Sequence, residues 1–345
     1  MHADIHHGFA SDNTTPICPE AWTALQQANA EYAPSYGEDK WTAEVCERIR
    51  EIFEVDCDVY FVFTGTGANA LALAQLCQPF HGVICHERAH IQTDEAGATE
   101  FYTRGAKLFL TKSSDGKIDL GEAEKLITQQ VELHGQMMRA ISIAQATELG
   151  TVYSPGEVEA SGAFARTRRM LLHMDGARFA NAVASLGCAP KTITWKAGVD
   201  VLTFGGTKNG VAAGELVIFF DKKISADFQY RAKQAGHLGS KMRFLAAPWL
   251  ALLNGDLWLR NARHANDAAR ELARRLQNEA GVETVFPVES NAVFVRLDDR
   301  VVRGLHARGW RFYKFVESDI YRLMCSWSTT EEEISGLVDD FVGIK

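Results

Sequence analysis

Short apolar runs alternate with amphipathic stretches over the first two-thirds of the chain. Residues 20–31 and 41–53 repeat apolar positions with helical spacing, which predicts two helices. Six later runs are rich in apolar or β-branched residues, as is typical of buried strands: VYFVF (59–63), GVIC (82–85), AISIAQ (140–145), LLHMD (171–175), DVLTFGG (200–206) and GELVIFF (214–220). Because helical stretches mostly lie between these runs, we expect a parallel sheet covered by helices.

The last third of the chain has a different pattern. A long helical stretch rich in Ala, Leu and Arg is predicted from about Pro248 to Glu279. Four strand-like segments and one amphipathic helix follow it: VETVFPV, NAVFVRL, GWRFYKF, YRLMCSW and TEEEISGLVDDFV. The expected fold class is therefore α/β, with a large, mostly parallel sheet domain in residues 1–250 and a smaller C-terminal α+β domain in residues 251–345.

Composition excludes several classes of protein. The 345 residues carry a net charge of -8 and no basic tract, so we expect no nucleic-acid partner. No segment approaches the roughly 18 uninterrupted apolar residues that cross a bilayer, so we expect no membrane partner. The seven cysteines form no CxxC pair, which favours free thiols and a cytoplasmic location. The natural partners are a small molecule and further copies of the chain.

Polar clusters follow most of the predicted strands directly. They are TGTGAN, HERAH, QATE, DGAR and GGTKNG. In parallel sheets, ligands bind at the carboxyl ends of the strands, so these clusters are expected to meet at one edge.

The first cluster has the features of a phosphate site. Gly65, Thr66 and Gly67 form a glycine-rich turn, and an Ala/Leu-rich helix follows it. Free amides at a helix start bind phosphate, and glycines let the phosphate come close. Taken alone, such a segment is more often only a tight turn, because neither a Walker ending nor GxGxxG spacing is present.

Two further clusters supply an acid and an amine. Asp175 ends a strand in HMDGARF, and Lys208 lies in the glycine-rich loop TFGGTKNG after Thr207. Separately, Asp175 is more often a helix cap and Lys208 a surface lysine. Together with the phosphate turn, they indicate pyridoxal phosphate: Lys208 as the Schiff-base lysine, Asp175 on the pyridine nitrogen, and Thr207 as a donor to the phosphate.

Five segments carry a resemblance to a known family. FASDN (9–13), YGED (36–39), TGTGAN, HMDGARF and FGGTKNG resemble the motifs of the threonine aldolase family, in particular those of low-specificity L-threonine and L-phenylserine aldolases. The resemblance implies the fold type I of pyridoxal-phosphate-dependent transferases with a seven-stranded sheet, and pyridoxal 5'-phosphate on Lys208. It also implies a homodimer or homotetramer with active sites at the dimer interface.

The same resemblance assigns roles to single residues. Gly65, Thr66 and Gly67 match phosphate contacts, His90 matches the histidine that stacks on the cofactor ring, and Asp175 matches the partner of the pyridine nitrogen.

Four more residues match substrate positions. Arg178 corresponds to a residue close to ring and substrate, while Ser11 and Arg322 correspond to residues that hold the substrate α-carboxylate. Tyr36 matches a residue that enters the neighbouring subunit's site. Whether Lys233 or Lys241 reaches the partner subunit's phosphate stays open.

The catalytic base is left with three candidates. The family often has a histidine where QATE has Glu148, and His134 lies nearby in the sequence. We favour His90 as the base that removes the β-hydroxyl proton, with His134 and Glu148 as alternatives.

The expected activity is cleavage of L-threonine, L-allo-threonine or L-phenylserine to glycine and an aldehyde. A β-eliminating lyase or an aminotransferase uses the same cofactor machinery and stays an alternative. A binding protein without catalysis would leave Lys208 unexplained. HERAH (86–90) matches the HExxH motif of zinc hydrolases, but it follows a strand directly where that motif needs a helix, so we expect no metal site.

Overall fold

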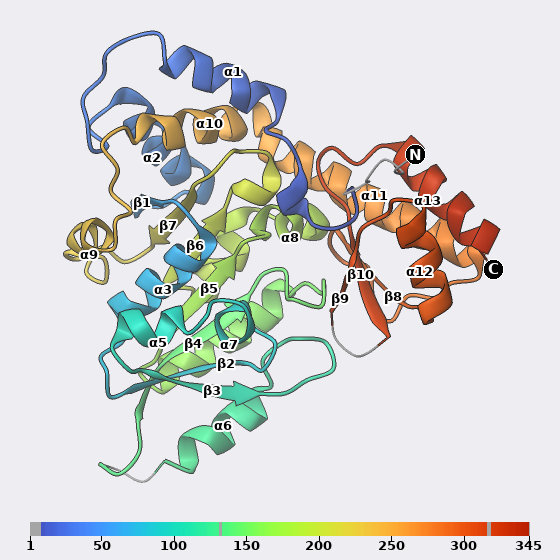
Figure 1. The fold of residues 1–345 in the computed structure, drawn as a ribbon. Coiled ribbons are helices and arrows are strands. Elements are labelled where there is room, and N and C mark those ends of the chain that lie inside the picture. The colour runs from blue at the N-terminus through green and yellow to red at the C-terminus, as the bar shows by residue number, and fades with distance from the viewer. Residues whose placement is uncertain (1–7, 131–132, 316–318, 345) are drawn as a thin grey trace.

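The computed structural model describes residues 8–130, 133–315 and 319–344. Two bodies lie side by side, each built on its own sheet, and one long helix runs from one to the other (Figure 1). The larger body holds a seven-stranded sheet, in the order β1-β7-β6-β5-β4-β2-β3. Its strands are β1 (Asp58–Val62), β2 (His81–His86), β3 (Lys107–Thr111), β4 (Met137–Ala144), β5 (Leu171–Gly176), β6 (Val201–Gly205) and β7 (Glu215–Phe219).

The large sheet confirms the predicted fold class. Its strands pair in parallel from β3 through β2, β4 and β5 to β6, and β7 alone runs antiparallel to both β6 and β1. All six predicted strands are present. The sequence pattern missed β3, whose burial alternates irregularly because it lies at the edge of the sheet.

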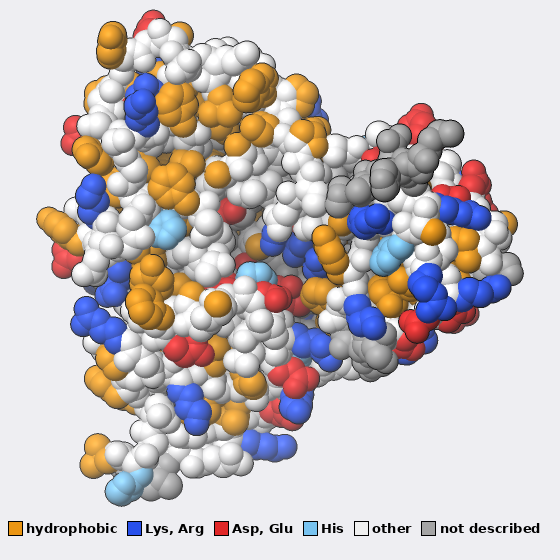
Figure 2. Space-filling model, viewed as in Figure 1, with side chains coloured by type: hydrophobic (Ala, Val, Ile, Leu, Met, Phe, Trp, Pro, Cys, Tyr) orange, Lys and Arg blue, Asp and Glu red, His pale blue; other side chains and the backbone are white. Residues whose placement is uncertain are grey.

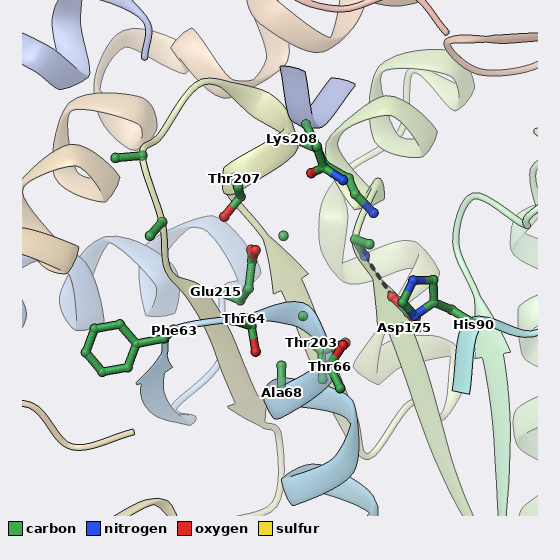
Figure 3. A pocket seen from close by; sticks show the side chains of 16 residues that line it. Phe63, Thr64, Thr66, Ala68, His90, Asp175, Thr203, Thr207, Lys208 and Glu215 are labelled. Atoms are coloured by element: carbon green, nitrogen blue, oxygen red, sulfur yellow. Dashed lines mark hydrogen bonds between the residues drawn. The ribbon is translucent and has the colours of Figure 1, made fainter. Parts of the chain in front are cut away.

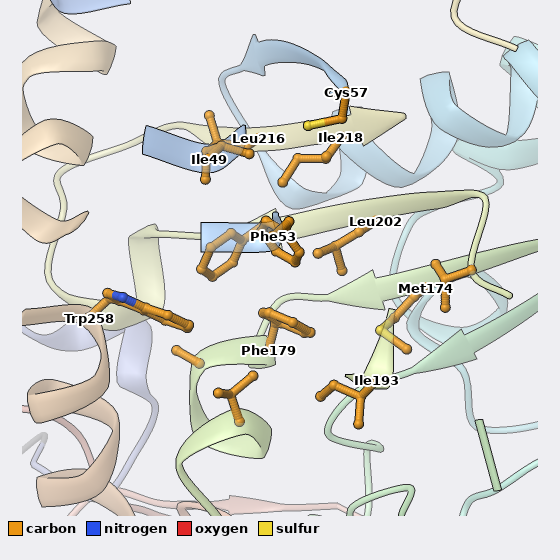
Figure 4. Packing of buried hydrophobic residues seen from close by; sticks show 14 of the residues in the cluster. Ile49, Phe53, Cys57, Met174, Phe179, Ile193, Leu202, Leu216, Ile218 and Trp258 are labelled. Atoms are coloured by element: carbon orange, nitrogen blue, oxygen red, sulfur yellow. The ribbon is translucent and has the colours of Figure 1, made fainter. Parts of the chain in front are cut away.

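Helices cover both faces of the large sheet, as predicted. They are α1 (Pro19–Ala28), α2 (Lys40–Phe53), α3 (Gly65–Leu76), α4 (His90–Thr93), α5 (Ala98–Thr103), α6 (Leu120–Thr128), α7 (Pro155–Thr167), α8 (Phe179–Leu186), α9 (Phe228–Gln234) and α10 (Arg243–Leu253). One apolar core contains residues of α3 and α9, and another contains residues of α2, α7, α8 and α10. In the second core, Phe53 stacks on Phe179 with ring centroids 5.8 Å apart (Figure 4).

The long helix predicted from Pro248 to Glu279 is two helices. α10 ends at Leu253, and α11 (Leu257–Ala280) starts after a turn in which Gly255 and Asp256 adopt positive φ angles of 59° and 55°. A left-handed conformation at two successive residues breaks the helical path, and the continuous Ala/Leu/Arg composition hid this break.

The smaller body surrounds a three-stranded antiparallel sheet. It contains β8 (Ala292–Arg296), β9 (Tyr313–Lys314), β10 (Ile320–Met324), α12 (Asp299–Ala307) and α13 (Glu331–Ile344). VETVFPV forms only an isolated bridge, between Thr284 and Val295, instead of the predicted strand. α11 supplies buried residues to the cores of both bodies, so the division at residue 250 stays a prediction.

The N-terminal segment connects the two bodies. Phe9 is buried in the smaller core, and its carbonyl accepts a hydrogen bond from the Met324 N–H at 3.0 Å. Three residues later, Asp12 bonds to Arg178 of the larger body. Within the three described ranges, no helix is long and apolar enough to cross a membrane.

Candidate active site

A cavity of about 470 Å³ opens at the carboxyl edge of the large sheet. Figure 2 shows a hollow between the two bodies where acidic, basic and histidine side chains gather. The polar residues that line the cavity come from segments far apart in the sequence (Figure 3): Asn13, Thr64, Thr66, His90, Asp175, Thr203, Thr207, Lys208 and Glu215. Four of the five polar clusters therefore contain or adjoin residues of this lining, as the strand-end rule predicts.

The start of α3 forms one wall of the cavity. The hydroxyl of Thr64 accepts a hydrogen bond from the Gly67 N–H at 3.0 Å and caps the helix. Gly65 and Thr66 line the cavity, and the first amides of a helix have no partner within the helix. This wall has the geometry and polarity that bind a phosphate group.

His237 packs against this helix start, which the sequence did not indicate. The Phe63 N–H donates to His237 Nδ1 at 3.1 Å, so Nε2 carries the ring proton. A Cβ added at Gly67 would lie 2.4 Å from His237 Cε1, closer than real contacts allow. Burial lowers the pKa of His237, so its ring is neutral at pH 7.

Replacing Gly67 with Ala is expected to displace the His237 ring and weaken phosphate binding at α3 by about tenfold, or ~1.4 kcal/mol. Titration of the protein with pyridoxal phosphate, followed by tryptophan fluorescence, measures the change. Gly156→Ala is the matched control, because a Cβ there meets nothing within 4 Å. Equal affinities of the two variants would show that the close packing at Gly67 does not matter for binding.

Lys208 reaches the cavity from a short turn after β6. The turn spans Thr207–Asn209, and the Lys208 side chain extends into the cavity on the side where Asp175 and His90 lie (Figure 3). Gly206 just before it has no room for a side chain, since a Cβ would lie 2.5 Å from Trp249 Cζ2. The glycine lets the backbone pass close enough to present the amine.

Glu215 holds this turn from below. Its Oε2 accepts the Gly206 N–H at 2.6 Å, and it also forms hydrogen bonds with Thr207. Burial raises the pKa of Glu215. Because the Thr207 side chain is bonded to Glu215 here, its predicted bond to a phosphate stays a prediction. An acidic residue inside the apolar run GELVIFF was the signal that sequence analysis did not use.

Asp175 lies at the end of β5 on the floor of the cavity. Its Oδ1 accepts the Ala177 N–H at 2.9 Å, and its Oδ2 accepts from Asn69 Nδ2 at 2.8 Å. The side chain is 7% exposed but borders the cavity, so it can receive one more donor from there. This is the environment that a protonated ring nitrogen requires.

His90 opens α4 on the same side of the cavity as Asp175. Its Nδ1 lies 2.8 Å from Oε1 of Glu95, which is buried. The hydrogen bond to Glu95 raises the pKa of His90. His86, the first histidine of HERAH, ends β2 and its Nε2 accepts the Ser113 N–H, so the two histidines do not share one helical face as a zinc hydrolase requires.

Two arginines, the buried Arg178 and the half-buried Arg322, lie close enough for their charges to interact. Arg178 donates from Nε and Nη2 to the two oxygens of Asp12, at 2.8 and 3.0 Å. Within the described residues, Nε of Arg322 is buried without a hydrogen-bond partner. Burial, together with the charge of Arg178, lowers the pKa of Arg322. Arg322, whose Cζ lies 4.4 Å from the Phe315 ring centroid, stays the predicted partner of a substrate carboxylate.

Asp12 was also missed, although it lies in FASDN beside Ser11. Ser11 caps the turn Asp12–Thr14 by accepting the Asn13 N–H at 3.2 Å. Burial opposes the charge on Asp12, but the charges of Arg178 and Lys208 and the hydrogen bonds from Arg178 and Asn291 together lower the pKa of Asp12 to about 2. The pair fixes the N-terminal segment next to the cavity.

Asp12→Asn is expected to reduce the free energy of unfolding by about 2 kcal/mol at pH 7. Since the folded pKa lies below the unfolded value, this contribution is present above about pH 4 and disappears as the pH falls toward 2. Urea unfolding at pH 7 and pH 3 measures it. The surface variant Asp267→Asn, whose partner Arg270 is exposed, should change little; equal losses in both variants would contradict the role of the buried pair.

Several predicted residues do not line the cavity: Ser11, Tyr36, Gly67, His134, Glu148, Arg178 and Arg322. His134 lies exposed in the turn before β4, whereas Glu148 follows the other end of that strand. The eight residues of β4 span roughly 26 Å, so His134 lies far from the end of the strand that Glu148 follows, although the two are close in sequence.

Tyr36 is 49% exposed and has a φ angle of 58°. Lys233 Nζ lies over its ring, 4.3 Å from the ring centroid. The predicted role of Tyr36 in a neighbouring subunit stays a prediction.

Comparisons with known proteins agree with this geometry. A family model described as "Beta-eliminating lyase" matches residues 8–300. The chain is 51% identical to a low specificity L-threonine aldolase of Pseudomonas aeruginosa over 96% of both chains, and 49% identical to one of Pseudomonas sp. over 98% and 97%. A threonine aldolase structure from Leishmania major superposes with a TM-score of 0.91 at 27% identity, covering 96% and 98% of the two chains. The chain therefore belongs to the beta-eliminating lyase family and, within it, to the threonine aldolases.

Proposed function

We propose that this protein binds pyridoxal phosphate and cleaves L-β-hydroxy-α-amino acids, among them L-threonine, L-allo-threonine and L-phenylserine, to glycine and an aldehyde. The observation that carries the proposal is the convergence of Lys208, Asp175 and His90 on one cavity beside Arg322. The donor set fits the cofactor: an amine for the covalent bond, a carboxylate for the ring nitrogen and a helix start for the phosphate. When bound there, pyridoxal phosphate supplies the electron sink for cleavage of a bond at the substrate α-carbon.

The arginine side of the cavity would position the substrate. Arg322, with Ser11 and Arg178 nearby, would hold the substrate α-carboxylate through paired hydrogen bonds. Fixing the carboxylate would disfavour its loss and leave the α-proton and the side chain bearing the β-hydroxyl as the groups open to cleavage. A base that takes the β-hydroxyl proton would then favour loss of the side chain.

His90 removes the β-hydroxyl proton in this scheme. Its Nδ1 is occupied by Glu95, so Nε2 is the nitrogen that can take a proton. Glu148 is half-buried, and its charge acts on His90, Arg178 and Arg322. Glu148 stays the second candidate for the base. Its negative charge would also repel the substrate carboxylate and so favour binding of that carboxylate at Arg322.

Aldehyde release tests the proposal against elimination and transamination. The purified protein is incubated with pyridoxal phosphate and, separately, with L-threonine, L-allo-threonine or L-phenylserine. We expect acetaldehyde from the first two and benzaldehyde from the third, with glycine in each case. A 2-oxo acid with ammonia would instead identify an eliminating lyase, and a 2-oxo acid formed only with an amino acceptor would identify an aminotransferase.

We also propose a homodimer or homotetramer with active sites at the dimer interface. Support comes from aromatic side chains exposed near the cavity: Phe63, which lines it, and Tyr36 and Tyr230, which border a surface hollow of about 350 Å³. Exposed aromatic residues gathered in one area are typical of interfaces. Sedimentation analysis measures the assembly. Lys233, held over Tyr36, and Lys241 remain the candidates to reach the partner's phosphate.

The cytoplasm is the proposed location. All seven cysteines have free thiols, and five of them are buried. Burial raises the pKa of most of these thiols, for example that of Cys46 to about 11, so they are unreactive. Such thiols suit a reducing compartment.

A further inference from the structure

A chain of buried hydrogen bonds links His90 to Asp175 below the cavity. Glu95 Oε1 lies 2.8 Å from His90 Nδ1, and Asn69 Nδ2 lies 2.9 Å from the same Glu95 oxygen. Asn69 Nδ2 also lies 2.8 Å from Asp175 Oδ2. The hydroxyl of Thr203 donates to Asn69 Oδ1 at 2.8 Å. Neither Asn69 nor Glu95 lines the cavity, so both act on it through other residues.

The orientation of Asn69 is fixed by its neighbours. Two carboxylates approach the same terminal atom of its amide, and a carboxylate only accepts hydrogen bonds when ionised. That atom must therefore be the NH₂ group, whose two hydrogens go to Glu95 and Asp175. The Thr203 hydroxyl on the amide oxygen agrees with this orientation.

Glu95 in turn fixes the protonation of His90. An ionised Glu95 accepts from Nδ1, which leaves the lone pair of Nε2 free to take a proton. Burial raises the pKa of Glu95, while the hydrogen bond from its carboxylate raises that of His90.

Glu95 is costly to keep in this position. Its side chain is fully buried, and in the described residues its Oε2 has no hydrogen-bond partner. A buried carboxylate with one empty oxygen is unfavourable for stability, and such groups cluster at functional sites. A packing role alone would be served better by an apolar side chain.

We propose that Glu95 and Asn69 are positioning residues: Glu95 holds His90 with Nδ1 protonated and Nε2 free, and Asn69 couples the charge of Glu95 to that of Asp175. The inference rests on the proposed function, because it takes His90 as the base. A change at Glu95 should then have two effects. It should alter the pKa of His90, and, through Asn69 and Asp175, the protonation of the ring nitrogen.

Glu95→Gln tests this inference, since it keeps the shape and removes the charge. In the holoenzyme, the lower-pH limb of kcat/KM for L-threonine should move to lower pH by about one unit, because His90 loses its anionic partner. The visible band of the bound cofactor is recorded against pH without substrate. The midpoint of its pH-dependent change should also move to lower pH. We expect kcat/KM to fall about 10- to 100-fold, by analogy with carboxylates that orient metal-binding histidines.

The control is Glu87→Gln, three residues before His90, where Glu87 forms an ion pair with the exposed Lys112. It should leave the pH profile, the visible band and the rate unchanged. If Glu95→Gln lowers the rate but moves neither pH dependence, its role is only structural and the inference is wrong.

Asn69→Ala supplies a second test that does not depend on the folding of Glu95→Gln. It cuts the link to Asp175 and leaves the Glu95–His90 bond in place. The cofactor band should therefore shift while the pH limb of kcat/KM moves less than in Glu95→Gln. An unshifted band would refute the coupling. If the wild-type protein releases no aldehyde, the proposed function fails instead, and the band still reports on the coupling.

Discussion

The variant Lys208→Ala is expected to lose at least about 10³-fold in kcat/KM for L-threonine, or ~4 kcal/mol of transition-state stabilisation. Lys208 is the lysine that lines the cavity, and the glycine before it brings its amine within reach of the floor formed by Asp175. Lys208 is the one lysine among the described residues that line the cavity, so the variant should lack the amine that we propose to hold the cofactor and to move a proton there. Steady-state kinetics measure the loss.

The visible spectrum gives an independent reading of the same variant. The band near 420 nm, roughly where protonated imines of pyridoxal absorb, should be missing in Lys208→Ala. Lys112→Ala, which removes a lysine that is 73% exposed, is the control and should keep both band and rate. Retention of the band by Lys208→Ala would mean that another lysine binds the cofactor, and the assignment of the site would be wrong.

Asp175→Asn is expected to lower kcat by about 10²- to 10³-fold. The substitution removes the negative charge that we propose to keep the ring nitrogen protonated, and an amide in its place would face a donor with its NH₂ group, either Asn69 Nδ2 or the Ala177 N–H. The ring then withdraws electrons less strongly while the shape of the cavity is kept. The measurement is kcat with saturating cofactor, together with the position of the visible band.

Asp200→Asn is the matched control for Asp175→Asn. Asp200 accepts the Leu172 N–H at 2.7 Å. Both residues lie at the amino ends of β5 and β6, whereas the cavity lies at the carboxyl ends. It should lower the free energy of unfolding without changing kcat. If Asp175→Asn retains the wild-type kcat, Asp175 does not serve the ring nitrogen and the proposed chemistry loses its electron sink.

The pattern of apolar runs predicted the large sheet because most residues of the strands inside it, β2, β5, β6 and β7, are buried and read as nearly continuous apolar sequence. β3 was missed because its apolar run, residues 108–110, is only three residues long and is flanked by Lys107 and Thr111. Gly255 and Asp256 break the predicted long helix, because both adopt a left-handed conformation.

The site was predictable where its chemistry sits directly at strand ends. Asp175 and Lys208 end or follow strands, so the topology alone brings them together. Asn69, Glu95 and Asp12 were not predicted, because they act through long-range hydrogen bonds that leave no periodic trace in the sequence.

The choice of base shows the same limit. His134 and Glu148 are close in sequence, but β4 lies between them, so they are at opposite ends of that strand. Distance along the chain says little about distance in space when a strand intervenes. His237 is the opposite case, distant in sequence from Gly67 but packed against it.

A complete product balance for L-threonine tests the central claim most directly. The holoenzyme is allowed to consume a known amount of L-threonine, and glycine, acetaldehyde, 2-oxobutanoate and ammonia are all measured in the same sample. We predict one glycine and one acetaldehyde for each L-threonine consumed, with no ammonia, and no reaction in Lys208→Ala. Equal amounts of 2-oxobutanoate and ammonia, without glycine, would contradict cleavage of the Cα–Cβ bond.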